Sequence, residues 1–197
     1  MLYCNSYSCK NKSNSLYINW LVELLGPVLL GSKPTEIVNI PFKDSNKETK
    51  INEIKTHFNN CKKIDIIFID KKEKGIRILF INRDSLENRL SCRKSRNFLK
   101  FLGYPKNYSL DSYINHLVIK LHEDSFPDEI GIFLGYPLKD VLGFMGYGKN
   151  ELHSIKSWRV YGNPTPSEEI YNLFLKHREA IRTLLTQQNA EYIVSLF

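Results

Sequence analysis

Apolar side chains recur every three or four residues over long parts of the chain, which is the spacing that places them on one face of a helix. In residues 50–60, for example, Ile51, Ile54 and Phe58 fall on a single stripe. Gly26-Pro27 and Gly103 with Pro105 supply the stop signals after two of these segments. The pattern predicts helices over residues 16–25, 50–60, 84–90, 94–102, 109–123, 137–146 and 166–188.

Other segments are rich in β-branched residues and are bounded by turn residues, which favours strands. Residues 64–69 and 76–81 flank a charged turn and predict a hairpin whose strands lie at or near the centre of a sheet. A further strand is expected over residues 156–161, with Trp158 and Val160 on one face and Arg159 and Tyr161 on the other. With residues 130–134 this gives a sheet of about four strands.

The stretch from Phe126 to Phe144 carries the most information, and it predicts a turn, a buried strand, a tight turn and a helix. Pro137 suits the first position of that helix, and Asp140 falls near the positive end of its dipole. Two interpretations are open. Free N–H groups at the helix start could bind an anion, or the glycines merely allow tight packing, which is the commoner case for such turns.

Length and composition indicate a single α+β (mixed α/β) domain over residues 16–197, preceded by an irregular segment over residues 1–15. The segment is polar and has no apolar core, so it does not resemble a signal peptide, and no apolar run is long enough to span a membrane. Cys4, Cys9, Cys61 and Cys92 have neither zinc-site nor disulfide-framework spacing. A reduced, cytoplasmic protein without metal or cofactor is therefore expected.

The chain has a net charge of +7 and a pI of about 9.1. Such a surplus attracts anionic partners, but no run of five basic residues occurs, so duplex nucleic acid is an unlikely target on sequence grounds. One stripe stands out as a candidate interaction surface, because its members would align if residues 89–100 formed one helix. Its members are Arg89, Arg93, Arg96 and Lys100. A solvated helix face interrupted near residues 91–95 is the simpler interpretation.

Several motifs together resemble a bacterial family, domain of unknown function 3793, which occurs mainly in anaerobic Gram-positive bacteria. The hallmark of the family resembles F-P-x-E-I-G-x-F-L-G-Y-P-x-x-D-V-x-G-F, and residues 126–144 match it. The matching segments outside the hallmark are Gly31-Ser32-Lys33-Pro34, Leu86-Glu87-Asn88-Arg89-Leu90, residues 98–104 and Trp158-Arg159-Val160-Tyr161-Gly162. The resemblance covers about residues 16–188 and implies no particular activity.

The chain departs from the resembled pattern at three positions. Leu25 and Ile155 stand where the pattern has cysteines, and Asp128 stands where it has histidine. Thiol, metal or imidazole chemistry in relatives would therefore be lost here, which favours a diverged binding role.

Three functions remain open. The first is a non-catalytic binding protein for a small anionic ligand such as a nucleotide, because cations and aromatic rings fall at turns. A sequestering or anti-defence protein would be one form of this function. Its expected ligand residues are Lys33, Tyr104, Tyr136, Lys139, Trp158 and Arg159.

The second is an inhibitor or adaptor that binds an acidic protein surface. The third is an enzyme of unknown class using Asp128, Glu129 or Asp140 with His153 nearby, although no nucleophile–base motif supports it. The sequence does not indicate an oligomeric state.

Overall fold

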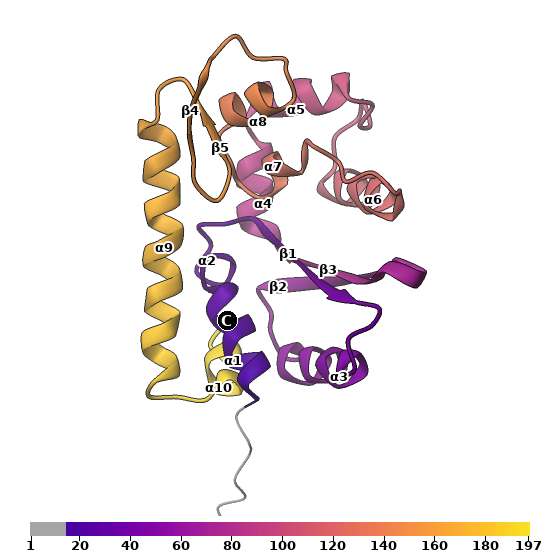
Figure 1. Ribbon diagram of the computed structural model, residues 1–197, viewed down its shortest axis with the longest axis vertical. Coiled ribbons are helices and arrows are strands. Elements are labelled where there is room, and N and C mark those ends of the chain that lie inside the picture. Colours follow the sequence, from indigo (N-terminus) through magenta and orange to yellow (C-terminus); the bar gives the residue numbers. More distant parts are fainter. Residues whose placement is uncertain (1–14) are drawn as a thin grey trace, which may run out of the picture.

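The computed structural model describes residues 15–197. The expected irregular segment, with Cys4 and Cys9, lies outside the described residues except for Ser15, whose hydroxyl caps the first helix at the N–H of Ile18. The mixed α/β class is confirmed (Figure 1). The described helices are α1 (Leu16–Leu24), α2 (Gly26–Leu29), α3 (Lys47–Phe58), α4 (Arg83–Leu90), α5 (Arg93–Phe101), α6 (Leu110–His122), α7 (Ile130–Phe133), α8 (Leu138–Phe144), α9 (Thr165–Leu185) and α10 (Ala190–Ser195).

The strands form two separate sheets. Strands β1 (Thr35–Pro41), β3 (Gly75–Asn82) and β2 (Ile64–Asp70) make an antiparallel sheet in that order, and β4 (Leu152–Ile155) pairs with β5 (Arg159–Tyr161) in a hairpin. The predicted hairpin of β2 and β3 is confirmed, with a short 3₁₀ turn at Lys72–Lys74 between its strands. Only β3 is central, and β1 and β4 were not predicted.

The two faces of the larger sheet support two hydrophobic cores. Ile78 and Phe80 face one core with α1, α2, α3 and α10, whereas Leu79 and Ile81 face the other with α4, α6 and α7. Figure 1 shows α3 on one side of this sheet and α4 and α6 on the other, with α9 running along the flank of the molecule. The alternation of side chains along β3 thus joins both halves of the protein.

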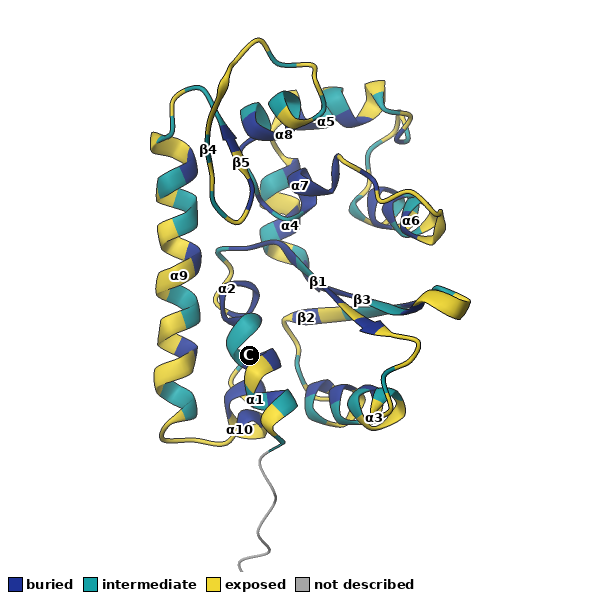
Figure 2. Cartoon of the chain, in the orientation of Figure 1, coloured by how far each residue is buried: buried dark blue, intermediate teal, exposed yellow. Residues whose placement is uncertain are grey.

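Residues 130–134 do not form the predicted strand. They contain α7, in which Ile130, Gly131, Ile132 and Phe133 are all buried (Figure 2). A short apolar run buried on every side has no periodicity that separates helix from strand, which explains the error. Close packing at Gly131 is confirmed, because a Cβ there would lie 2.8 Å from Cγ2 of Val141.

The segment Phe-Leu-Gly-Tyr-Pro occurs twice, and both copies end a helix in the same way. In each copy the tyrosine N–H bonds five residues back, from Tyr104 to Leu99 and from Tyr136 to Gly131. The preceding Gly103 and Gly135 have φ of 96° and 85°, as a Schellman helix end requires. Phe144-Met145-Gly146-Tyr147 closes α8 with the same bonds.

Side chains that precede α4 and α9 bind backbone N–H groups at the starts of these helices. Asn82 caps α4, because its side chain accepts the N–H of Ser85. α9 begins at Thr165, whose N–H donates to the side chain of Asn163. Ser167, two positions into the helix, is fully buried against Asp140.

Candidate functional site

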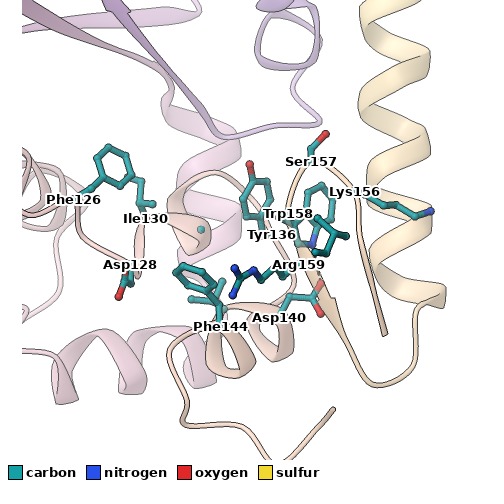
Figure 3. Close-up of a pocket in the computed structure, with 13 residues that line it drawn as sticks. Phe126, Asp128, Ile130, Tyr136, Asp140, Phe144, Lys156, Ser157, Trp158 and Arg159 are labelled. Carbon is teal, nitrogen blue, oxygen red and sulfur yellow. Dashed lines mark hydrogen bonds between the residues drawn. The ribbon is translucent and has the colours of Figure 1, made fainter. Parts of the chain in front are cut away.

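A groove of about 370 Å³ lies between α8, the segment before α7 and the β4–β5 hairpin. We call it the hairpin groove (Figure 3). It contains three of the expected ligand residues, Tyr136, Trp158 and Arg159. The other described residues on its walls are Phe126, Asp128, Ile130, Gly131, Asp140, Val141, Phe144, Ile155, Lys156 and Ser157.

Tyr136 and Trp158 form the aromatic wall of the groove. Their rings stack with centroids 4.3 Å apart and an interplanar angle of 15°. The backbone of Tyr136 is held in place because its carbonyl accepts a hydrogen bond from the guanidinium of Arg89. Burial, with a smaller contribution from Glu36, raises the pKa of Tyr136 to about 12, so its hydroxyl stays neutral even at alkaline pH.

Asp140 forms a polar junction behind this wall. Its carboxylate is 2% exposed and accepts four hydrogen bonds, which join α8 to β5 and α9. The donors are Nε1 of Trp158 at 2.9 Å, the N–H of Tyr161 at 2.9 Å, Nζ of Lys139 at 2.7 Å and Oγ of Ser167 at 2.6 Å. We call this arrangement the Asp140 junction.

The donors at the junction determine the ionisation of Asp140. Burial by itself would raise the pKa of this carboxyl, but the hydrogen bonds from Lys139, Ser167, Tyr161 and Trp158 outweigh it and lower the pKa below its ordinary value. Both carboxylate oxygens are engaged. Asp140 is therefore an ionised structural residue. The acid/base role considered for it from the sequence would need a free carboxylate oxygen, and both oxygens are already hydrogen-bonded.

Lys139 and Lys33, both expected to contact a ligand, are engaged within the protein. The ammonium of Lys139 also donates to the carbonyl of Tyr161 at 2.7 Å and to Oγ of Ser167 at 2.9 Å, which uses all three of its protons. Lys33 is 9% exposed and pairs with Glu36 at 2.7 Å. It lies in a smaller hollow of about 120 Å³ that shares Tyr136 and Trp158 with the hairpin groove.

Tyr104 is not on the walls of the hairpin groove. It is 2% exposed, and its hydroxyl contacts Glu129, which also pairs with Lys120. Its ring is 4.3 Å from that of His116. The expectation that Tyr104 offers a contact surface is corrected: its helix end turns the side chain into the core, where it joins α5, α6 and α7.

Arg159 is the cation of the groove that remains available. Its guanidinium lies over the ring of Phe144 at 5.6 Å and has no hydrogen bond or ion pair within residues 15–197 (Figure 3). The side chain of Lys156 extends away toward α9, where it pairs with Glu168 at 3.0 Å. Arg159 thus places one unpaired positive charge beside aromatic rings.

The predicted basic stripe does not form a single face. α4 and α5 are separate helices, and Arg89 is half-buried, with burial lowering its pKa. Arg96 donates to the carbonyl of Ser91 and lies over the ring of Tyr108. Arg93 and Lys100 are exposed.

Sequence reasoning missed Phe126, Phe144 and Ile155 as groove residues. All three are large apolar side chains with at least 44% of their surface exposed. Phe126 and Phe144 are the two ends of the most informative stretch, which was the available signal, whereas Ile155 belongs to the unpredicted strand β4. Asp128 and Ile155, two of the departures from the resembled pattern, line the groove, and Leu25 lies in the core.

Residues 21–194 match the model of a protein family described as protein of unknown function (DUF3793). The chain belongs to this family. The family assignment expected from the hallmark is therefore confirmed. No curated protein and no solved structure matches the chain.

The described part of this DUF3793 chain lacks two features. No cluster of three or more histidine, cysteine, aspartate or glutamate side chains within residues 15–197 is placed to hold a metal ion. In the same residues, no helix is both long and apolar enough to cross a bilayer.

Proposed function

We propose that this chain is a non-catalytic binding protein whose hairpin groove takes a small ligand with a flat apolar body and one anionic group. A nucleotide with a single phosphate is the leading example. The observation that supports the proposal is the position of Arg159, an unpaired guanidinium in a groove whose walls are mainly aromatic and aliphatic. A charge left without a partner beside apolar walls is suited to an incoming anion.

The size and walls of the groove agree with such a ligand. Pockets for small molecules usually measure roughly 300–1,000 Å³ and are lined mainly by apolar and aromatic groups. The volume of about 370 Å³ is at the lower end of that range. Phe144 and the Tyr136–Trp158 stack offer ring faces on which a base or another planar group could stack.

The charges favour a ligand with few negative groups. Lys33, Lys139 and Lys156 are each paired with a carboxylate, so Arg159 is left to meet the anion. Asp128 at the rim would repel a second anionic group. A nucleoside triphosphate is for this reason a poorer match than a monophosphate or an aromatic carboxylate.

Titration with defined probes tests the proposal. AMP, GMP and 8-anilinonaphthalene-1-sulfonate would be titrated by calorimetry and by tryptophan fluorescence, with adenosine as the uncharged comparison. We expect Arg159→Ala to weaken binding of the anionic probes about tenfold or more, since charge-assisted hydrogen bonds contribute about 1.5–3 kcal/mol. The matched control is Lys176→Ala, which removes an exposed cation on α9.

Two results would contradict the proposal. One is no saturable binding of any anionic probe at millimolar concentration together with protein that carries no small molecule in native mass spectra after purification from cells. The other is equal binding by wild type and Arg159→Ala, which would place the probe outside the groove.

A second function, an adaptor or inhibitor that binds an acidic protein surface, is favoured by a different observation. Residues 88–110 contain six cations and no carboxylate, so the surplus charge is more local than its scatter along the chain suggested. Beside them, Phe101 is 68% exposed and Tyr147 is 54% exposed, with ring centroids 5.6 Å apart. Exposed aromatic rings beside cations are typical of interface anchors.

The double variant Arg93→Glu/Lys100→Glu tests the adaptor function. It should abolish retention of a stoichiometric protein partner in a pull-down from cells, whereas Lys176→Glu should retain that partner. Binding of small anionic probes should not change in either variant, which separates the two functions. A partner that both variants retain equally would rule out this surface.

A further inference from the structure

The hairpin groove contains one free carboxylate as well as one free cation. Asp128 lines the groove, is exposed, and has no hydrogen bond or ion pair within residues 15–197. The other carboxylate on the groove wall, Asp140, accepts four hydrogen bonds at its junction. Asp128 is therefore the acidic counterpart of Arg159, because both are charged groups on the groove wall that the folded chain leaves without a partner.

The backbone at Asp128 is held on both sides. Its neighbours Pro127 and Glu129 are buried. Glu129 pairs with Lys120, and the N–H of Ile130 donates to the carbonyl of Pro127 at 3.1 Å, which closes the turn around Asp128. The exposed side chain of Asp128 thus projects from a fixed turn, so little backbone freedom is lost when the carboxylate binds a ligand.

Asp128 and Arg159 lie on different walls of the groove and do not form an ion pair with each other. Asp128 precedes α7, whereas Arg159 belongs to β5. In the view of Figure 3, the ring of Phe144 lies between the guanidinium of Arg159 and the carboxylate of Asp128. A single ligand that meets both charges therefore carries its anionic group at one end and hydrogen-bond donors at the other, with an apolar middle.

We propose that Asp128 accepts hydrogen bonds from the Watson–Crick edge of guanine, so that the preferred ligand of the hairpin groove is a guanosine monophosphate. This inference rests on the binding function proposed above, in which Arg159 meets the anionic group. An ionised carboxylate has two acceptor oxygens and no donor. Guanine carries two adjacent donors, the N1–H and the 2-amino group, and can donate one hydrogen bond to each oxygen.

The other bases match a carboxylate less well, because each presents an acceptor beside its donor. Adenine has N1 next to its 6-amino group, cytosine has N3 next to its 4-amino group, and uracil has one N–H between two carbonyls. Each would place an acceptor against a carboxylate oxygen, and polar sites reject ligands that leave their groups unpaired. Because Asp128 is exposed, we expect a preference of about tenfold, smaller than that of a fully buried site.

Affinity ratios among monophosphates of equal charge test the proposal. GMP, IMP and AMP would be titrated into the full chain by calorimetry, where IMP keeps the N1–H of GMP but lacks its 2-amino group. We expect GMP to bind about tenfold or more tightly than AMP, with IMP between them. Asp128→Ala should reduce the ratio of the GMP and AMP affinities to about one. Arg159→Ala should weaken all three ligands by a similar factor and keep the ratio.

Two further variants provide the controls. Glu169→Gln, which removes an exposed carboxylate on α9, should keep both the affinities and their ratio. Asp128→Asn replaces one acceptor by a donor, which complements N1 and the 6-amino group of adenine, so this variant should bind AMP at least as tightly as GMP. Loss of folding cannot imitate such a change of specificity. Thermal denaturation should show both Asp128 variants folded, since the side chain has no partner to lose.

Three outcomes would overturn the inference. Equal affinities for GMP and AMP in the wild type, both weakened by Arg159→Ala, would exclude base recognition by Asp128 and leave the anion site intact. A preference for GMP that Asp128→Ala retains would assign the base to other residues. No saturable binding of any of the three monophosphates at millimolar concentration would also overturn it, and binding of 8-anilinonaphthalene-1-sulfonate by the same protein then decides whether the proposed function stands.

Discussion

The Asp140 junction and the hairpin groove share the indole ring of Trp158, and they use their polar groups in opposite ways. At the junction, every proton of Lys139 and both oxygens of Asp140 are engaged, and Nε1 of Trp158 is one of the donors. In the groove, the face of Trp158 stacks on Tyr136, and the guanidinium of Arg159 has no polar partner within the described chain. The junction therefore fixes the indole of Trp158, which forms part of the groove wall.

This difference separates stability from binding. Removing one member of a buried, fully bonded set leaves uncompensated donors or charge, which is costly to the folded state. Removing an exposed, unpaired cation leaves nothing uncompensated. We therefore expect substitutions at the junction to affect stability and substitutions at Arg159 to affect binding.

The largest effect is expected for Asp140→Ala. It would strand Lys139, the indole N–H and the hydroxyl of Ser167 without their acceptor, and breaking a buried ion pair from one side costs about 3–5 kcal/mol. Urea denaturation would measure the loss in unfolding free energy. Ser167→Ala, which removes a neutral hydroxyl that donates to Asp140 and accepts from Lys139, should cost about 1–2 kcal/mol, and equal losses in the two variants would contradict a charge-centred junction.

Gly143→Ala is expected to cost less, about 1–3 kcal/mol from overpacking, partly offset by the better helix propensity of alanine. A Cβ at this position of α8 would lie 2.4 Å from the ring of Tyr161 on β5. The test is a double-mutant cycle with Tyr161→Ala. If the clash is the cause, the cost of Gly143→Ala should nearly vanish without that ring.

The contribution of Asp140 should also depend on pH. Its pKa is lowered in the folded protein, so the stability it supplies is present above the unfolded pKa of about 3.9 and is lost as the pH falls through the folded value. The stability difference between wild type and Asp140→Asn should therefore be constant near neutral pH and shrink below about pH 4. A difference that grows on acidification would have the wrong sign for this assignment.

Local signals in the sequence were sufficient for most helices and for the β2–β3 hairpin, because their periodicity, caps and turns are read within a few residues. They were insufficient where burial comes from distant segments. α7 is buried on all sides by other elements, so its residues carry no helical stripe. β1 has alternating, β-branched residues, but its pairing with β3 depends on a partner some 40 residues away.

The site shows the same division. Trp158, Tyr136 and Arg159 were identified from residue type at turns, and the structure brings them together. The same reasoning selected Lys139, Lys33 and Tyr104, whose partners Asp140, Glu36 and Glu129 engage them. Residue type indicates what a side chain can bind, whereas only the fold shows whether another group of the chain has already bound it.

The smallest effect on stability is expected for Arg159→Ala. The side chain is exposed, has no hydrogen bond or ion pair within residues 15–197 and lies over the half-exposed ring of Phe144, so the change in unfolding free energy should be less than about 1 kcal/mol. The same variant should weaken binding of an anionic aromatic probe by about tenfold or more. Thermal denaturation with and without 8-anilinonaphthalene-1-sulfonate measures both quantities on one sample. A variant that loses several kcal/mol of stability would show that Arg159 belongs to the junction, and the separation of stability from binding would not hold.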